Sequence, residues 1–282
     1  MNTNPLFWPL LITFAAGVAG VGLSRLAHLR RLRPVFAAIL FVVAYVAVYG
    51  KFFPTPRGAT NKLFYAGLFG LALPLIPQRW GKAGALLALL PALWIAAPLL
   101  SIHGLSIHGL SIHGAGFGLV LILLLGALVL LRAAAFAASA RPGAGALFWV
   151  MALALLGGAA PIALAGGSST SLLLLLALVA GGAPWALAEF LAPQQGEAGL
   201  AFFWSGPISL ATILLLVTGA EDGAYLLALV LLVLLLSEAA MRALARRKRP
   251  RLVVLAAGVA LLLAALGVAG ALYLAAPEAF QP

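Results

Sequence analysis

The sequence predicts an all-α, polytopic integral membrane protein with about ten transmembrane helices. The 282 residues are 65% hydrophobic and only 8% charged, whereas an ordinary soluble domain is about 25% charged. The mean hydropathy is +1.16. A soluble fold of this size would need far more polar residues to cover its surface. The chain also contains no cysteine, which excludes disulfides, thiolate metal sites and a cysteine nucleophile.

Apolar runs of membrane-spanning length recur along the chain. A spanning helix needs about 20 mostly apolar residues. Ten segments meet this requirement approximately, at residues 6–24, 35–50, 63–77, 83–100, 115–138, 146–165, 172–192, 200–219, 224–243 and 252–275. The segment 63–77 is the weakest, because it is short and contains Pro74, and a half-crossing helix is the alternative there.

The Lys and Arg residues favour one orientation in the membrane. If the N-terminus is outside, the connections after the first, third, fifth, seventh and ninth helices are cytoplasmic. These connections and the adjoining helix ends hold all but three of the 17 basic residues, namely Arg25, Arg30, Arg31, Arg33, Arg79, Lys82, Arg132, Arg141, Arg242, Arg246, Arg247, Lys248, Arg249 and Arg251. Cytoplasmic loops are enriched in Lys and Arg. We therefore expect an inner (plasma) membrane protein with both termini on the non-cytoplasmic side.

Ten helices in one domain, residues 1–282, divide into two halves of five, at 1–140 and 141–282. A shift of about 141 residues places Leu6-Phe7-Trp8 on Leu147-Phe148-Trp149. Because five is odd, such halves would be inverted relative to each other, as in many secondary transporters. The alternative is a chance overlay of evenly spaced helices.

Several classes of function are disfavoured. The connections are too short for a soluble catalytic domain, and the first apolar run reads as an anchor because basic residues follow it rather than precede it. We found no phosphate-binding, metalloprotease, calcium or serine-nucleophile motif. No predicted span contains histidine, so we expect no haem and no other cofactor. The basic residues stand in short clusters beside apolar segments, so we expect no nucleic-acid partner.

A tandem repeat connects two of the predicted helices. Ser101-Ile102-His103-Gly104-Leu105 recurs at 106–110 and in part at 111–114, which places His103, His108 and His113 five residues apart. Neither a helix nor a strand brings side chains at this spacing onto one face. A short duplication in a surface loop is therefore the preferred interpretation, and a metal site formed by a turn-rich loop is the alternative.

Three ionisable residues lie within predicted spans, and such residues are candidates for function. Glu238 stands four residues before Arg242, a spacing that predicts a local ion pair on one helix face. Arg132 lies near the predicted cytoplasmic end of its helix, and its side chain can reach the membrane surface. Glu189 has no partner within one helical turn. It is either a buried functional acid, with Arg132 as a candidate partner, or a residue that faces the headgroups.

Aromatic and hydroxyl residues accompany Glu189 in the sequence. Prolines at 184 and 207 mark places where the predicted helices bend or break. A site between those helices would contain the residues Trp185, Glu189, Trp204, Ser205 and Ser209, with Arg132 nearby. The alternative is a pair of kinked helices with tryptophans at the membrane interface.

The connection at residues 51–62 departs from the charge pattern. It places Lys51, Arg57 and Lys62 on the predicted outer side, among phenylalanines, prolines and polar residues. Such a loop could bind an anionic headgroup, an anionic solute or a partner protein, or be a plain connector.

Taken together, these features favour a small transporter or permease for an organic or lipid-like solute. A non-catalytic subunit or assembly factor of a larger membrane complex is the alternative, and an enzyme is disfavoured. A transporter predicts a polar site at membrane depth, whereas a subunit predicts a dry interior and a wide apolar face. The expected partners are the lipid bilayer and, for a subunit, another membrane protein.

Overall fold

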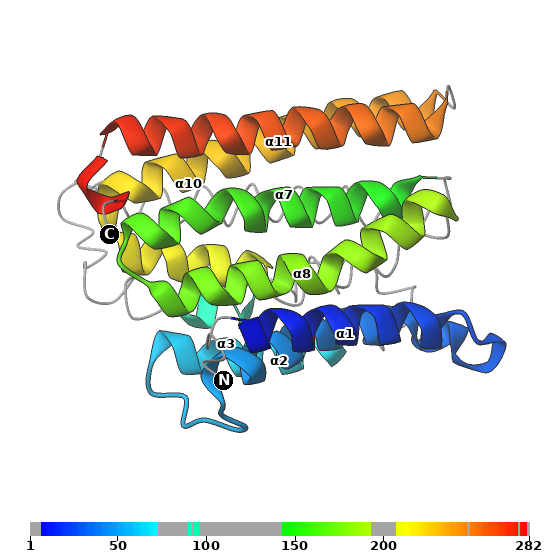
Figure 1. Ribbon diagram of the computed structural model, residues 1–282, viewed down its shortest axis with the longest axis horizontal. Coiled ribbons are helices and arrows are strands. Elements are labelled where there is room, and N and C mark those ends of the chain that lie inside the picture. Colours follow the sequence, from blue (N-terminus) through cyan, green and yellow to red (C-terminus); the bar gives the residue numbers. More distant parts are fainter. Residues whose placement is uncertain are drawn as a thin grey trace, which may run out of the picture.

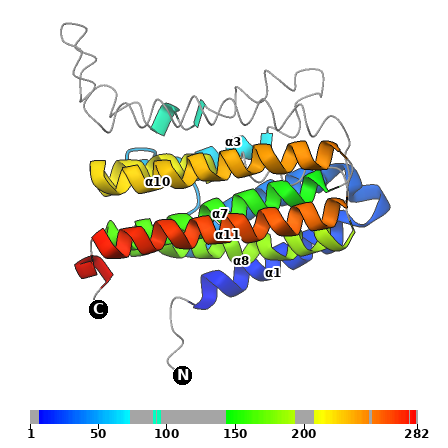
Figure 2. The ribbon, with the colours of Figure 1, turned by 90° about the horizontal axis from the view of Figure 1, so that it is seen from above.

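The computed structural model describes residues 7–72, 90–91, 93–95, 143–192, 207–246, 249–275 and 277–280. Within these residues the regular elements are helices, aligned roughly along one common direction (Figures 1 and 2). They are α1 (Phe7–Ser24), the 3-10 helix η1 (Ala27–Leu32), α2 (Arg33–Tyr49), α3 (Ala59–Ala72), α7 (Ala144–Ala165), α8 (Ser169–Leu191), α10 (Pro207–Ala245), α11 (Pro250–Ala275) and the 3-10 helix η4 (Pro277–Phe280).

Six segments of the described chain are long and apolar enough to cross a membrane. They are Phe7–Ser24, His28–Tyr49, Ala144–Ala165, Ser169–Leu191, Tyr225–Ala245 and Pro250–Ala275. Each coincides with a predicted span to within a few residues, apart from an earlier start at His28. The protein is therefore an all-helical, multi-pass membrane protein. The predicted spans 83–100 and 115–138 lie largely or wholly outside the described residues, as does the end of 63–77, so the count of ten stays a prediction.

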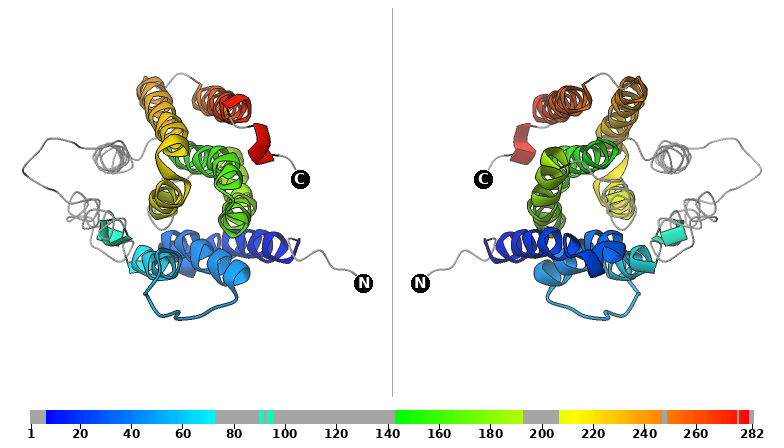
Figure 3. Two further views of the ribbon diagram at one scale, coloured as in Figure 1. Left: turned by 90° about the vertical axis from the view of Figure 1, so that its left-hand side faces the viewer. Right: turned by 90° about the vertical axis from the view of Figure 1, so that its right-hand side faces the viewer.

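One expected connection keeps a helical backbone. We expected a short turn at Glu221 and Asp222 between two spans, but the backbone is helical from Pro207 to Ala245, 39 residues in all. A single glycine costs a helix only about 1 kcal/mol, so Gly219 and Gly223 do not end it. Figures 1 and 3 show that the first part of α10 (yellow) and its later part (gold) lie side by side and are joined at one end, so the chain reverses direction within this helix. Pro207 begins the helix, the position that proline favours, instead of breaking it.

Helix α7 lies at the centre of the described bundle. It packs against α8 on one side and against α10 and α11 on the other, and α8 also contacts α1 and α2. In the membrane span of α7, 67% of the residues are buried, whereas in the spans of α1 and α11 only 28% of the residues are buried. Large apolar side chains on α1 and α11, such as Phe14 and Leu262, therefore point away from the protein, as lipid-facing residues do.

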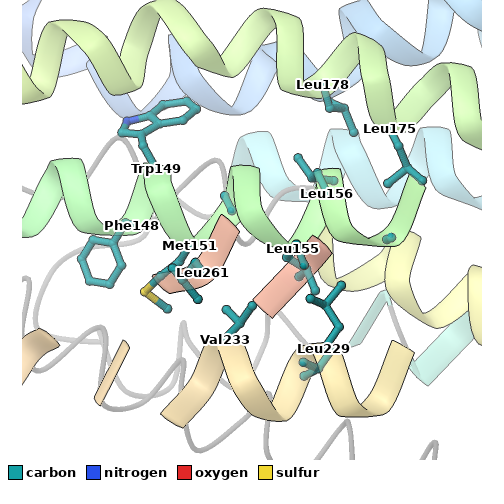
Figure 4. Packing of buried hydrophobic residues seen from close by; sticks show 14 of the residues in the cluster. Phe148, Trp149, Met151, Leu155, Leu156, Leu175, Leu178, Leu229, Val233 and Leu261 are labelled. Atoms are coloured by element: carbon teal, nitrogen blue, oxygen red, sulfur yellow. The ribbon is translucent and has the colours of Figure 1, made fainter. Parts of the chain in front are cut away.

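The interior around α7 is apolar. Trp149 and Leu156 of α7 lie on the side that faces Leu175 and Leu178 of α8, whereas Leu155 lies on the opposite side. On the opposite side of α7, the buried side chains come from α10 and α11 and include Leu229, Val233 and Leu261 (Figure 4). Each of these residues is at most 4% exposed. The described helices thus share one continuous hydrophobic core.

Helices α1 and α8 pack backbone against backbone. A Cβ atom added at Gly17 would lie 2.2 Å from the carbonyl oxygen of Gly181, and one added at Gly181 would lie 3.0 Å from the carbonyl oxygen of Thr13. Small residues at such crossings are typical of membrane helices. We expected α8 to bend near Pro184; it is helical from Ser169 to Leu191, and Figure 1 shows its axis bending in its later part.

The two ends of the bundle differ in charge. At one end, which we name the arginine end, α1, α8 and α10 finish and α2, α7 and α11 begin (Figure 1). Its described cations are Arg25, Arg30, Arg31, Arg33, Arg242, Arg246, Arg249 and Arg251. The opposite end, the termini end, holds both ends of the described chain and the cations Lys51, Arg57 and Lys62.

Candidate functional site

A buried ion pair joins α2 to α8 at the arginine end. The guanidinium of Arg33, the first residue of α2, donates a hydrogen bond to Oε1 of Glu189, which lies two residues before the end of α8. The Glu189 side chain is fully buried and the Arg33 side chain is 11% exposed. Charges removed from water are stable only when they are paired and hydrogen-bonded, so each residue depends on the other.

Two tryptophans cover this pair. The guanidinium carbon of Arg33 lies 5.8 Å from the ring centroid of Trp185, within the range of a cation–π interaction. Trp185 in turn stacks on Trp149 of α7, with ring centroids 5.5 Å apart and an interplanar angle of 18°. Both indoles are fully buried. They exclude water from the pair and thereby strengthen its electrostatic attraction.

The carboxylate of Glu189 also rests on the first turn of α7. A Cβ atom added at Gly145 would lie 2.7 Å from Oε2 of Glu189, so a glycine is needed there for the carboxylate to approach. The first backbone N–H groups of a helix have no partner within the helix, and the helix dipole favours a negative charge at this end. Glu189 is thus stabilised both by Arg33 and by its place at the start of α7.

The site contains donors that are not satisfied by the described part of the chain. In that part, Nε of Arg33 and Nε1 of Trp185 are buried and have no hydrogen-bond acceptor. Arg25 and Arg30 lie close enough to Arg33 to repel it electrostatically. The site is therefore rich in positive charge and N–H donors, and it suits an acceptor with negative charge.

The structure brings together two of the residues that the sequence singled out. Glu189 and Trp185, four residues apart on α8, are both fully buried. Glu189 is thus buried in the protein and paired with Arg33, while its role as a functional acid stays a prediction. Ser209 lies in α10, while Trp204, Ser205, Arg132 and the repeat that holds His103, His108 and His113 lie outside the described residues.

The predicted local pair on α10 is confirmed. Nε of Arg242 lies 3.2 Å from Oε1 of Glu238, and the Arg242 side chain is 71% exposed. This pair is the exposed counterpart of the buried one. Across the described ranges, no three His, Asp or Glu side chains gather as a metal site would require.

Arg33 is the residue that sequence reasoning missed as part of the site. It was counted among the loop cations, whereas it begins α2 and continues the buried face formed by Ala37, Leu40 and Ala44. Those spacings of three and four residues follow the period of an α-helix. The period was therefore a usable signal that Arg33 points inward.

The fold and the site define a multi-pass helical membrane protein with a buried Arg–Glu pair under two stacked tryptophans. Comparison with known proteins finds no matching family model, no matching curated protein and no matching solved structure. The functional argument therefore rests on the site itself.

Proposed function

We propose that the protein is a small transporter or permease for an organic or lipid-like solute that carries an acceptor-rich anionic group. The observation that supports this proposal most directly is the buried pair of Arg33 and Glu189. Ionisable residues within membrane spans are expensive to bury and commonly mark a substrate or ion pathway. A purely structural role could be filled by apolar side chains of similar volume, often at no loss of stability.

The mechanism we propose is an exchange of partners. Arg33 presents several N–H donors in a planar fork, which fits a carboxylate or a phosphate. An anionic group that approaches from the arginine end competes with Glu189 for this fork, and Nε1 of Trp185 supplies a further donor. Glu189, once released, keeps the stabilisation it receives from the start of α7. When no solute is present, Arg33 and Glu189 pair again, and the pair blocks the passage of solute through the site.

This proposal includes the expected topology. The arginine end is cytoplasmic, both termini are non-cytoplasmic, and about ten helices form two halves that alternate access to the site. The unequal distribution of cations between the two ends supports this orientation. The opposite directions of α1 and α7 (Figure 1) are those that inverted halves require.

Single cysteines test the orientation, since the chain contains none of its own. We expect Arg57→Cys to react with a membrane-impermeant maleimide in intact cells, because it lies in an exposed loop at the termini end. We expect Arg246→Cys to react only after permeabilisation. The opposite pattern, or equal reaction of both in intact cells, would contradict the orientation.

Transport itself is tested with purified protein in proteoliposomes. We would measure uptake of a panel of labelled carboxylates and phosphate esters by the wild type. For any solute taken up, the double variant Arg33→Gln/Glu189→Gln is expected to lose at least about tenfold in rate, since the site loses the fork that binds the anion. The matched control is Glu238→Gln/Arg242→Gln, which removes an exposed pair and should keep wild-type uptake. Unchanged uptake in the buried double variant would refute the role of the pair.

One observation favours the alternative, a non-catalytic subunit of a membrane complex. The buried polar or charged residues of the described bundle are few, namely Thr13, Ser24, Arg33, Ser171, Glu189 and Ser237. A dry interior suits a protein that works through its outer faces. This alternative predicts no uptake by the purified protein and a second chain in fixed stoichiometry after extraction from the native membrane.

A further inference from the structure

A connected chain of aromatic rings occupies the termini end of α2 and α3. Tyr45 contacts Tyr49 and Phe64, with ring centroids 4.6 and 5.5 Å apart. Phe64 also contacts Phe53 at 5.4 Å and Tyr65 at 5.6 Å. The last ring is that of Trp94, whose centroid lies 6.3 Å from that of Tyr65. The chain leads from the fully buried Tyr45 to Phe53, which is 70% exposed.

The loop beside these rings is held in a definite conformation. The hydroxyl of Tyr65 donates to the carbonyl oxygen of Pro54 at 2.8 Å, and the amide of Asn61 donates to the carbonyl oxygen of Thr55 at 2.9 Å. Phe53 has a φ of 49°, an unusual conformation for a bulky residue. These contacts hold Phe52 and Phe53 with 70% of their surface exposed.

Three cations lie in the same segment as the exposed rings, and that segment contains no acid. Lys51 and Arg57 are exposed, and Nζ of Lys62 lies 5.2 Å from the Trp94 ring centroid and donates to the Trp94 carbonyl oxygen at 3.2 Å. Residues 51–72 contain no Asp or Glu. This group of cations is the exception to the charge distribution of the bundle, and it coincides with the exposed phenylalanines.

The same cluster contains a buried hydroxyl that the described residues leave without a hydrogen bond. The hydroxyl of Tyr45 is buried and, in the described part of the chain, makes no hydrogen bond. A buried hydroxyl without a partner is costly, so the cluster is incomplete without a group that accepts hydrogen bonds.

We propose that this cluster binds an anionic phospholipid of the leaflet at the termini end. The phosphate fits the three cations of this segment, and the acyl chains fit the exposed rings of Phe52 and Phe53. Aromatic side chains and cations at the membrane interface are suited to such headgroups. A free phosphate would satisfy the charges but would leave the two phenylalanines in water. The proposal is independent of the transport function.

A fluorescent label in the loop tests this site directly. Thr55→Cys, which is unique in a chain without cysteine, is labelled with bimane and reconstituted into nanodiscs of phosphatidylcholine with increasing phosphatidylglycerol. We expect a saturable change in emission on phosphatidylglycerol. The change should be lost in Lys51→Gln/Arg57→Gln/Lys62→Gln and retained in Arg31→Gln/Arg246→Gln/Arg249→Gln, which removes three cations from the arginine end.

Two further measurements keep the outcome decisive. If the triple variant does not fold, the single variant Arg57→Gln should weaken the phosphatidylglycerol response about fivefold. Inorganic phosphate at 10 mM, added to phosphatidylcholine nanodiscs, should leave the emission unchanged. An unchanged lipid response in the loop variants, or its loss in the arginine-end control, would overturn the proposal. A response to inorganic phosphate alone would assign the site to a soluble anion instead.

Discussion

Glu189→Gln is expected to lower the free energy of unfolding by about 3–5 kcal/mol, because it leaves the charge of Arg33 buried without a counter-ion. The substitution preserves the size and shape of the side chain, so packing against Trp185 and Gly145 changes little. Unfolding of the purified protein in mixed micelles with increasing sodium dodecyl sulfate, followed by tryptophan fluorescence, measures the difference.

Two controls separate the ion pair from other effects of the substitution. The double variant Arg33→Gln/Glu189→Gln should be more stable than either single variant, since no buried charge is stranded. Glu238→Gln removes the acid of the exposed pair and should cost less than about 1 kcal/mol. If the two buried single variants were additive and nearly neutral, the pair would contribute nothing to stability.

Gly17→Ala is expected to destabilise the protein by about 3 kcal/mol, because overpacked interiors must shift to admit even one methyl group. The new Cβ would lie 2.2 Å from the carbonyl oxygen of Gly181. Backbone cannot move aside as the end of a flexible side chain can, so α1 and α8 must separate along their crossing. The same unfolding experiment measures the loss.

Gly22→Ala is the matched control for this substitution. Gly22 lies on the same helix five residues later, and an added Cβ meets no atom within 4 Å. Alanine is the better helix former by about 1 kcal/mol, so this variant should be neutral or slightly stabilised. Equal losses for Gly17→Ala and Gly22→Ala would show that the crossing of α1 and α8 is looser than the structure has it.

The membrane spans were the most predictable part of the fold. Their length and apolar character are set by the thickness of the bilayer, so α1, α2, α7, α8 and α11 begin and end close to the predicted positions. The helical backbone at Glu221 and Asp222 was not predictable in this way. Two adjacent acids between glycines are typical of a turn, and local composition does not reveal that the helix continues through them.

The candidate site was predictable in part. Glu189 stood out because it is an acid in an apolar segment, and Trp185 stood out because it lies one turn before it. Their true neighbours did not, since Arg33 is 156 residues from Glu189 in the sequence and Trp149 lies on another helix. Contacts over such separations depend on how helices pack, and a single sequence carries little information about that. Arg33 also resembled the loop arginines beside it.

The crossing of α1 and α8 bears on the biogenesis of the protein. Ribosomes extend a chain at about 5–20 residues per second, so roughly 8–33 seconds separate the synthesis of Gly17 from that of Gly181. During this interval the glycine face of α1 lacks its α8 partner, and Arg33 lacks Glu189. The crossing therefore completes only late in synthesis, after most of the chain has been made. Substitutions at the crossing would then lower the yield of mature protein before they alter its activity.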